Sequence, residues 1–596
     1  MAVEATHTQT ALYADQRNGV FALLTRVLPL ALILATNGLL LWYFHDRFWY
    51  PADEGNYAHV AQRLLTGEVL NRDIQDIHAG YINFVNAAAF RLFGLDLVSL
   101  RYPLIAISFF QAILVFFVFY RSGRKRLAIA AAIVINALGL IDYLNPTANW
   151  YSVFLAILIV CALEWIPRNS RARLLVVGCL IGTLVLFRQL SGALVCISLL
   201  TYLLLESRSS AVVASAREVL LARLLIAVMA LGLAAYLARA TDFMGFVLFG
   251  TCPLLLLVWL FVRTVTPNRE VAKILALLSI GGICASLPLF AYHLFHRSLG
   301  AWLNDTVLGA IGLTRLGFME QKLYGRLISA GFWQLFHAAN IGEFLNALYW
   351  IALPLLAFVN GIFLLFLLLR NSKHESRGLR HLPYALPIVS MFYGIVSIHF
   401  QIPIYLYYTT GFSLIGLLWL VPRKFWTQHS ALIASLALSG IAIFYHAGQP
   451  LSGRFSVLFG GQRNVLSLDQ ALSSLPRVSL KISPEEDAQY SHLLKIIESE
   501  TQPNDTIFAM PTNAELYFLS GRRNPFRFYN TALGVRNGID LKNVEETIVV
   551  DPPRLIVYRP DDKYNTPYSR EIIRFVKERY DLLEESGGFE IYRSRT

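Results

Sequence analysis

Apolar segments long enough to cross a membrane follow one another from residue 19 to about residue 445 of the 596-residue chain. Each run spans roughly 18–25 residues, the length that an α-helix needs to cross the hydrocarbon core of a bilayer. Only 15% of the residues are charged and 56% are hydrophobic, which leaves too few charges to cover the surface of a soluble protein of this length. The sequence therefore predicts a polytopic α-helical membrane protein with about 13 transmembrane helices.

The basic residues of these segments fall in every second loop, as in the cluster Arg121, Arg124, Lys125 and Arg126. The positive-inside rule makes such loops cytoplasmic. The net charge of +12 is thereby explained by membrane orientation, and we expect no nucleic-acid partner. We predict a multi-pass protein of the inner or plasma membrane with a cytoplasmic N-terminus. The long polar loops 45–101 and 295–345 and the C-terminus are then extracytoplasmic.

Composition divides the chain into three parts: a cytoplasmic tail (1–18), a transmembrane domain (19–447) and a soluble extracytoplasmic α/β domain (448–596). In the last part apolar runs shorten and charge rises. Ser483-Pro-Glu-Glu486 is a capping box with proline at the first helical position, which predicts a helix to about residue 500. Strands are expected at 505–510, 554–558 and 589–592, and helices at 513–519 and 569–580. This domain has no glycine-rich phosphate loop and no triad motif.

Acidic residues gather in the first long loop, where Asp53-Glu54 is followed by Asp73, Asp76 and His78, and Arg101 opens the next span. Carboxylates at a membrane surface are costly, and a functional site explains them better than packing does. Within the loop, residues 82–93 are apolar but short, and we expect an interfacial helix there. A solvated surface remains the alternative for the acidic pair.

Further polar residues are predicted at the same end of the spans: Asp142, Asn145, Asn149, Arg188 and Gln189. Arg188 interrupts an apolar run, where an unpartnered arginine is expensive, so it indicates a site or a structural ion pair. Asp142 lies in a turn and can instead cap a helix. Arg101 can instead extend its guanidinium to the lipid headgroups.

These residue types suit glycosyl transfer from a lipid phosphate. A carboxylate base takes the proton of the acceptor hydroxyl while that oxygen attacks the anomeric carbon, and arginine suits the departing phosphate. Asp53 or Glu54 is the candidate base, with Asp142 as a further catalytic carboxylate. Arg101 and Arg188 are the candidate phosphate ligands, and a single displacement inverts the anomeric centre. Candidates for binding the acceptor or the sugar are Tyr57, Asp73, Asp76, His78 and Asn149.

Metal binding has weaker support in the sequence. His59, His78 and Asp142 are the candidate ligands of a divalent cation, but no HxxxH or HExxH spacing is present. The five cysteines lie in or beside apolar segments and form no CxxC pair, so neither a zinc site nor a disulfide framework is indicated.

The first loop resembles the first periplasmic loop of GT-C-fold glycosyltransferases. Its matching motifs are Asp53-Glu54, Gly67…Asp73…His78, Leu92-Phe93-Gly94 and Arg101-Tyr102. The segments QPNDTIFAMPTNAELYFLSGRRNP and PPRLIVYRPDD are similar to the extracytoplasmic domain of that group, which includes protein O-mannosyltransferases, aminoarabinose transferases and lipopolysaccharide-core galacturonosyltransferases. The chain departs from many of them in having His78-Ala79-Gly80 where they have His-Pro-Pro.

This resemblance implies a GT-C fold and a polyprenyl-phosphate-linked monosaccharide donor. The acceptor would be a glycolipid, a polysaccharide or a protein. Asp53 would be the base and Glu54 its neighbour or substitute, Asp142 would help to position the acceptor or a metal, and Arg101 would contact the lipid phosphate.

Two other functions remain open at the level of sequence. A transporter or flippase for a lipid-linked sugar would often show inverted repeats and broken helices, and the chain has no clear internal repeat. A non-catalytic scaffold for envelope assembly would bind its partners through the C-terminal domain and would tolerate the loss of Asp53.

Overall fold

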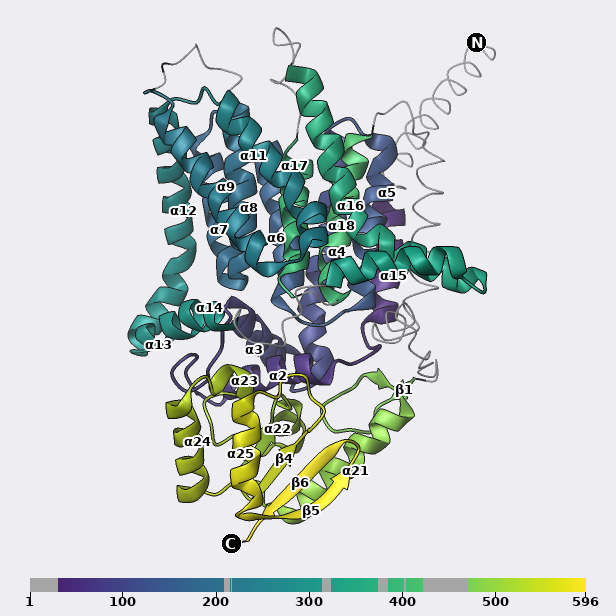
Figure 1. Cartoon of the computed structure of the whole chain (residues 1–596), viewed down its shortest axis with the longest axis vertical. Coiled ribbons are helices and arrows are strands. Elements are labelled where there is room, and N and C mark those ends of the chain that lie inside the picture. The colour runs from purple at the N-terminus through teal and green to yellow at the C-terminus, as the bar shows by residue number, and fades with distance from the viewer. Residues whose placement is uncertain are drawn as a thin grey trace, which may run out of the picture.

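A bundle of long helices stands on a smaller α/β domain formed by the C-terminal part of the chain (Figure 1). The computed structural model describes residues 30–207, 215, 217–313, 323–372, 384–400, 403–421 and 470–595. The predicted tail 1–18, the predicted thirteenth span at 430–445 and the predicted domain boundary at residue 447 lie outside these residues. The described chain has the predicted class, a helical membrane protein with a separate α/β domain.

Seven helices among the described residues are long and apolar enough to cross a membrane, and four shorter apolar helices accompany them. The long ones are α4 (Arg101–Arg121, extended by the 3-10 turn Leu97–Leu100), α6 (Ala148–Trp165), α8 (Gln189–Ser207), α9 (Leu220–Ala240), the segment Phe243–Arg263, α12 (Asn268–Phe295) and α16 (Ile341–Ser372). The shorter ones are Leu30–Phe44, Leu127–Ala137 in α5 (Lys125–Ala137), Ala385–Ile398 and Ile404–Leu420 in α18 (Pro403–Leu420). The segment Ala385–Ile398 comprises α17 (Ala385–Tyr393) and a 3-10 turn, and Phe243–Arg263 ends in α11 (Thr251–Arg263).

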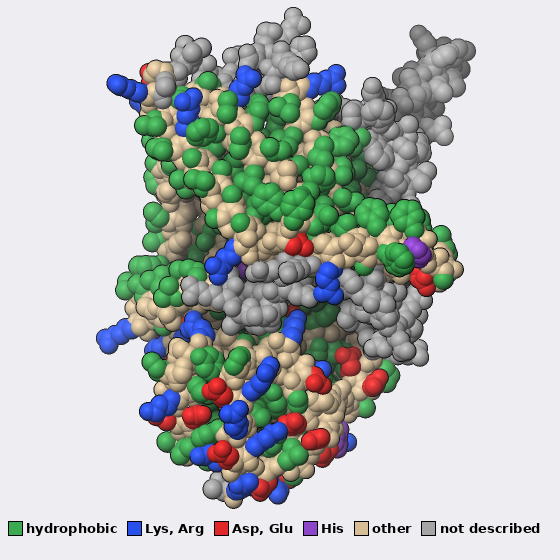
Figure 2. Space-filling model, in the orientation of Figure 1, with side chains coloured by type: hydrophobic (Ala, Val, Ile, Leu, Met, Phe, Trp, Pro, Cys, Tyr) green, Lys and Arg blue, Asp and Glu red, His purple; other side chains and the backbone are tan. Residues whose placement is uncertain are grey.

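With α7 (Arg171–Phe187), a helix lies at every predicted span that falls on described residues. A broad hydrophobic surface covers the bundle, and Lys and Arg side chains gather at its end remote from the C-terminal domain (Figure 2). The basic loops and the C-terminal domain therefore lie at opposite ends of the bundle, as the loop charges predict.

The first long loop folds into two helices that lie between the bundle and the C-terminal domain (Figure 1). They are α2 (Pro51–Leu65) and α3 (Tyr81–Phe93), and α3 matches the short helix expected at 82–93. Pro51 occupies the first turn of α2, where a missing N–H costs nothing. The chain leaves α3 at Gly94, whose φ of 97° favours glycine.

The second long loop contains short helices at the same end of the bundle. They are α13 (Leu299–Leu303), the π-helix Asn304–Gly309, α14 (Ala310–Leu313) and α15 (Leu323–His337). Figure 1 shows α15 lying across the bundle and projecting beyond it.

The C-terminal domain contains a four-stranded sheet in the order β3-β4-β6-β5. β3 (Ile507–Met510) and β4 (Leu555–Tyr558) are parallel with Ile507 opposite Leu555, and β6 (Phe589–Ser594) runs antiparallel to both β4 and β5 (Tyr580–Ser586). The helices are α21 (Pro484–Glu500), α22 (Glu515–Ser520), α23 (Thr531–Gly534), α24 (Gly538–Val550) and α25 (Pro567–Lys577), and β1 (Ala471–Leu472) and β2 (Lys481–Ile482) form a separate pair.

The Ser483 hydroxyl accepts the N–H of Glu486 at 3.2 Å, so the predicted cap of α21 is confirmed. Strand β3 begins two residues later than predicted. Strand β5 and helix α24 were not predicted, because their apolar residues do not follow a clear period: Leu582, Ile539 and Val550 are all exposed.

The C-terminal domain and the first loop share one apolar core. Phe90 of α3 stacks on Phe518 of α22 with ring centroids 5.4 Å apart. Gly55 of α2 lies so close to α22 that a Cβ atom there would come within 2.5 Å of the Glu515 Cβ. Glycine at position 55 therefore allows α2 and α22 to approach this closely, since any larger residue would clash. The sheet domain is thus packed firmly onto the loop that carries the acidic pair.

Candidate active site

Asp53 lies in the first turn of α2 and faces the bundle. Its Oδ2 accepts a hydrogen bond from the hydroxyl of Tyr143, in the turn that follows α5. Burial raises the pKa of the Asp53 carboxyl, while the Tyr143 hydrogen bond and the positive charges of Lys563 and His78 oppose that rise. The residue as a whole is partly exposed, while its carboxyl group is buried. Tyr143 is its hydrogen-bond partner among the described side chains, and a carboxylate positioned in this way can act as a general base.

Glu54, one residue further on, is in a different environment. Its Oε1 accepts the Nε of Arg101 at 2.7 Å, its Oε2 accepts the N–H of Tyr50 at 3.0 Å, and both charged side chains are fully buried. Arg101 donates its remaining hydrogen bonds to the carbonyl oxygens of His45, Arg47 and Phe48.

Burial bears on two residues that the sequence offered for the reaction, Arg101 as a phosphate ligand and Glu54 as a base. Neither side chain is exposed, so Arg101 presents no donor and Glu54 no oxygen at the surface. The pair instead ties the start of α4 to the start of α2 and to the strand-like segment before it.

Arg188 lies at the break between α7 and α8, at the end of the bundle that carries Asp53. Its Nη1 donates to Asn149 Oδ1, and its Nη2 donates to the Tyr405 hydroxyl at 3.4 Å. The Nε atom is buried and has no hydrogen-bond partner among the described residues. A buried guanidinium with an unused donor is suited to an anionic ligand.

His78 approaches the same region from the loop between α2 and α3. Its Nδ1 lies 2.8 Å from Asp76 Oδ1, which also accepts the His78 N–H at 2.9 Å. Asn83 donates to the other oxygen of Asp76 at 2.6 Å. Burial acts to raise the pKa of Asp76, but these contacts outweigh it and the net shift is downward. The ionised Asp76 therefore orients the His78 ring, which lies beside the ring of Tyr57.

Aromatic side chains connect these groups. The ring centroids of Tyr143 and Tyr408 are 6.1 Å apart, and those of Tyr408 and Tyr405 are 5.4 Å apart. Tyr57 lies 5.8 Å from His78 by the same measure. The chain Asp53–Tyr143–Tyr408–Tyr405–Arg188 thus joins the carboxylate to the arginine through packed aromatic rings.

The structure brings Asp53, Tyr57, His78, Asn149 and Arg188 to one region, and it places other candidates elsewhere. Asp73 accepts the Val69 N–H at 2.8 Å and pairs with Arg72 at 2.9 Å on the surface. His59 is buried against the Tyr517 ring at 4.8 Å. The side chain of Asp142 lies outside the described part of the chain.

In the part of the chain that the structure describes, no three His, Cys, Asp or Glu side chains are grouped so that they could hold a metal ion. Of the metal candidates, His78 contacts Asp76 through Nδ1, and His59 is buried on α2 against the Tyr517 ring of α22. The third candidate, Asp142, has its side chain outside the described part of the chain, and no step below uses a metal ion.

Three aromatic residues of the site, Tyr143, Tyr405 and Tyr408, were not singled out from the sequence. Tyrosines at span ends ordinarily form an interfacial belt, so their residue type alone does not mark them. The available signal was their place in the sequence: Tyr143 directly follows Asp142, and Tyr405 and Tyr408 follow the proline at position 403 between two apolar runs.

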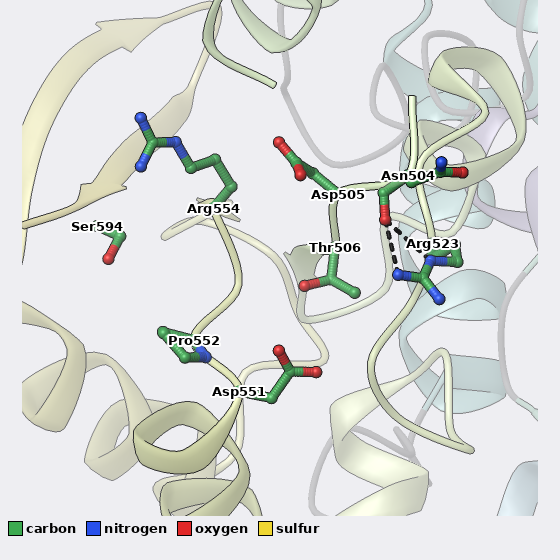
Figure 3. Close-up of a pocket in the computed structure, with 8 residues that line it drawn as sticks. All are labelled: Asn504, Asp505, Thr506, Arg523, Asp551, Pro552, Arg554 and Ser594. Atoms are coloured by element: carbon green, nitrogen blue, oxygen red, sulfur yellow. Dashed lines mark hydrogen bonds between the residues drawn. The ribbon is translucent and has the colours of Figure 1, made fainter. Parts of the chain in front are cut away.

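A separate polar hollow lies on the C-terminal domain, at the amino ends of β3 and β4 (Figure 3). There, Arg523 donates through Nε and Nη2 to the Asn504 carbonyl at 3.0 and 2.7 Å. The opposite ends of these strands lead to Thr512 and Arg559, beside α22 and thus beside α2. The hollow therefore lies on the side of the sheet away from Asp53.

Comparison with known proteins finds similarity in structure only. No family model and no curated protein sequence matches the chain. Among solved structures, ArnT from Cupriavidus metallidurans bound to undecaprenyl phosphate is 12% identical, with a TM-score of 0.38 over 95% of this chain and 97% of that one. The archaeal oligosaccharyltransferase AglB from Archaeoglobus fulgidus, in complex with an inhibitory peptide and a dolichol-phosphate, is 11% identical, with a TM-score of 0.44 over 90% and 70%.

Proposed function

We propose that this protein is a glycosyltransferase of the GT-C type that moves a monosaccharide from a polyprenyl-phosphate carrier to an envelope acceptor, with inversion at the anomeric carbon. The observation that carries the proposal is that Asp53 and Arg188 lie at the same end of a helical bundle, and that the Nε of Arg188 has no hydrogen-bond partner among the described residues. The motifs of the first loop resemble those of this enzyme group and support the same conclusion.

In the proposed reaction, Asp53 removes the proton of the acceptor hydroxyl as its oxygen attacks the anomeric carbon. The bond between that carbon and the phosphate oxygen breaks, and the polyprenyl phosphate leaves with the electron pair. A positioned base of this kind contributes about 10²–10⁴-fold to the rate. The Tyr143 hydroxyl, which donates to Asp53, keeps the carboxylate oriented and resists its protonation.

Arg188 is the proposed ligand of the departing phosphate. Its Nε has no hydrogen-bond partner among the described residues, and the residue lies at the break between α7 and α8. Arg101 was the other candidate, but its buried pairing with Glu54 makes it a structural residue in this proposal.

The proposed location of the site is the extracytoplasmic face. The argument is the charge of the loops, since the basic clusters are at the other end of the bundle. Labelling of a single cysteine introduced at the exposed Glu578, in intact cells or right-side-out vesicles with a membrane-impermeant maleimide, tests this orientation.

The function is tested by measuring release of polyprenyl phosphate from purified protein in nanodiscs. The assay contains a panel of polyprenyl-phosphate sugars and membrane-extract acceptors, and it compares wild type with Asp53→Asn and the matched control Asp73→Asn. Asp73 is an acid of the same loop that lies on the surface.

We expect release by wild type and by Asp73→Asn, and a loss of about 10²–10⁴-fold in Asp53→Asn. Equal release by all three proteins would remove Asp53 from the mechanism. Binding of lipid-linked sugar without release from any donor would favour a transporter or an assembly scaffold.

A further inference from the structure

The loop that carries Asp76 and His78 has little regular structure of its own. Residues 69–80 form turns and short bridges, yet Asn71, Gln75 and Asp76 are almost completely buried. Polar residues that are buried in a loop must obtain their hydrogen bonds from other elements. The partners of this loop therefore determine where His78 lies.

One partner comes from the bundle. Gln189, next to Arg188, donates through Nε2 to the carbonyl of Ile77 at 2.9 Å and to that of Thr306 at 3.3 Å. This contact ties the residue before His78 both to α8 and to the π-helix Asn304–Gly309.

The central partner is Arg527 of the C-terminal domain, between α22 and α23. Its Nη2 donates to the Asn71 carbonyl at 2.6 Å and to Asp305 Oδ2 at 2.7 Å. Its own carbonyl accepts the Gln75 N–H at 2.7 Å. A single residue thus contacts the His78 loop at two points and the second long loop at a third.

Asp305 completes the connection. It is fully buried in the π-helix, a type of helix that occurs frequently at functional sites. The Asn71 amide donates to Asp305 Oδ2 at 3.1 Å and to the Asp76 carbonyl at 2.8 Å. Burial raises the pKa of Asp305, and the charge of Arg527 acts against that rise. Arg527 is therefore one of the groups, with Asn71 and Arg536, that favour the ionised form of this buried carboxyl.

We propose that Arg527 is a positioning residue of the active site, which acts through Asp305 and Asn71 to hold the Asp76–His78 pair where His78 can bind the acceptor hydroxyl beside Asp53. The inference rests on the function proposed above and extends it, because it makes the C-terminal domain part of the acceptor site. Arg527 itself touches no substrate.

A purely structural role for the Arg527–Asp305 pair is the alternative. Asp305 is fully buried but the Arg527 side chain is 38% exposed, and ion pairs that reach the solvent contribute about 0–1 kcal/mol, so stability alone is a weak reason for this one. The two roles differ in one respect that can be measured. A positioning residue loses its effect on activity when the residue on which it acts is removed, whereas a structural residue keeps it.

The first test is a double-mutant cycle with the full-length protein in nanodiscs, in the polyprenyl-phosphate release assay. The variants are Arg527→Gln, His78→Asn and their combination, with Arg527→Lys as the conservative variant. The matched control is Arg523→Gln, an arginine of the same domain on the far side of the sheet. A variant that combines Arg527→Gln with Asp305→Asn removes both charges and guards against a failure to fold.

Misplacement of a binding group by about 1 Å can cost about 10²-fold, so we expect Arg527→Gln to lower kcat/KM by about 10–100-fold, chiefly through the KM of the acceptor. Arg527→Lys should recover part of the loss, and the control should match wild type. In the His78→Asn background, Arg527→Gln should add less than about twofold. Full additivity, or an unchanged acceptor KM in Arg527→Gln, would overturn the proposal.

The second test does not depend on turnover. Modification of His78 by diethyl pyrocarbonate, followed by mass spectrometry, reports how firmly the ring is held, with the exposed His492 as internal reference. We expect His78 to react several-fold faster in Arg527→Gln while His492 is unchanged; equal rates would overturn the proposal. A positive result here together with an active Asp53→Asn variant would reject the proposed function and retain the positioning role.

Discussion

Two neighbouring carboxylates at the start of α2 have opposite surroundings. On one side, Glu54 and Arg101 are both completely buried, and every oxygen of Glu54 has a donor. On the other side, Asp53 has only Tyr143 as a side-chain hydrogen-bond partner among the described residues, and the buried Nε of Arg188 has none. Groups that are fully paired inside the protein hold it together, whereas incompletely paired polar groups can still bind a ligand. In the proposed function, Glu54 therefore has a structural role and Asp53 a chemical one.

Of the substitutions that test this comparison, Glu54→Gln should have the largest effect, which is a loss of stability. The substitution leaves Arg101 buried without a counter-charge, and removing one partner of a buried pair costs about 3–5 kcal/mol of stability. Denaturant or thermal unfolding in detergent measures the loss. The control is Glu546→Gln, whose pair with Lys542 at 3.6 Å is exposed and contributes about 0–1 kcal/mol. If Glu54→Gln unfolds like wild type and loses only activity, Glu54 would have a role in the reaction, and the contrast with Asp53 would be wrong.

Arg188→Gln should act on the reaction instead. Loss of a donor to a developing anion costs about 10²–10³-fold in rate, and we expect a fall of this size in polyprenyl phosphate release. Arg188→Lys should restore a part, because lysine keeps the charge and lacks the fork. Arg91→Gln, at an exposed arginine of α3, is the control. Equal turnover by Arg188→Gln and wild type would move the phosphate site away from the α7–α8 break.

Glu515 offers an intermediate case, a buried carboxyl that has no ion pair among the described residues. Burial raises its pKa from 4.5 to about 7. Between these values the folded state holds the proton more tightly than the unfolded state, so stability falls as pH rises through this window. We expect Glu515→Gln to abolish that fall and to be more stable than wild type at pH 8 by up to about 3 kcal/mol.

Unfolding curves at several values between pH 4 and pH 8 measure this difference, with the exposed Glu578→Gln as control. A wild-type stability that does not change across the window would show that Glu515 is ionised in the folded protein at neutral pH. In that case Glu515, which lies against Gly55, would be a buried carboxylate in its charged form, as Glu54 is.

The smallest expected effect is that of Tyr143→Phe. The Tyr143 hydrogen bond lowers the pKa of Asp53 against the effect of burial, so its loss should raise that pKa further. Because the base acts when ionised, activity falls as pH drops through this pKa, and the acid limb of the kcat/KM profile should move upward by about one unit or less. Tyr151→Phe removes a hydroxyl that has no hydrogen-bond partner within the described ranges, and it should leave the limb in place. If the acid limb does not move in Tyr143→Phe, the pKa that it reports does not belong to Asp53.

Features that depend on neighbouring residues in the chain were predictable. The spans follow from the length of apolar runs, and the start of α21 follows from Ser483 and the residues after it. The position of Arg188 between α7 and α8 also agrees with the sequence, since an arginine in an apolar run favours a break or a partner. Weakly periodic elements such as β5 and α24 were missed for the same reason, because their local pattern is poor.

Membrane spans, loop charge and the location of the acidic pair follow from the sequence, because bilayer thickness and charge act on short stretches of chain. The separate roles proposed for Asp53 and Glu54 do not follow from the sequence. Successive residues of a helix point about 100° apart, so two adjacent acids meet different partners. Tyr143 lies 90 residues after Asp53, and Arg101 lies 47 residues after Glu54. The contact of Arg527 with Asp305 spans 222 residues and joins two parts of the protein. Only the packed structure brings these side chains together, because local sequence carries no record of such distant pairing.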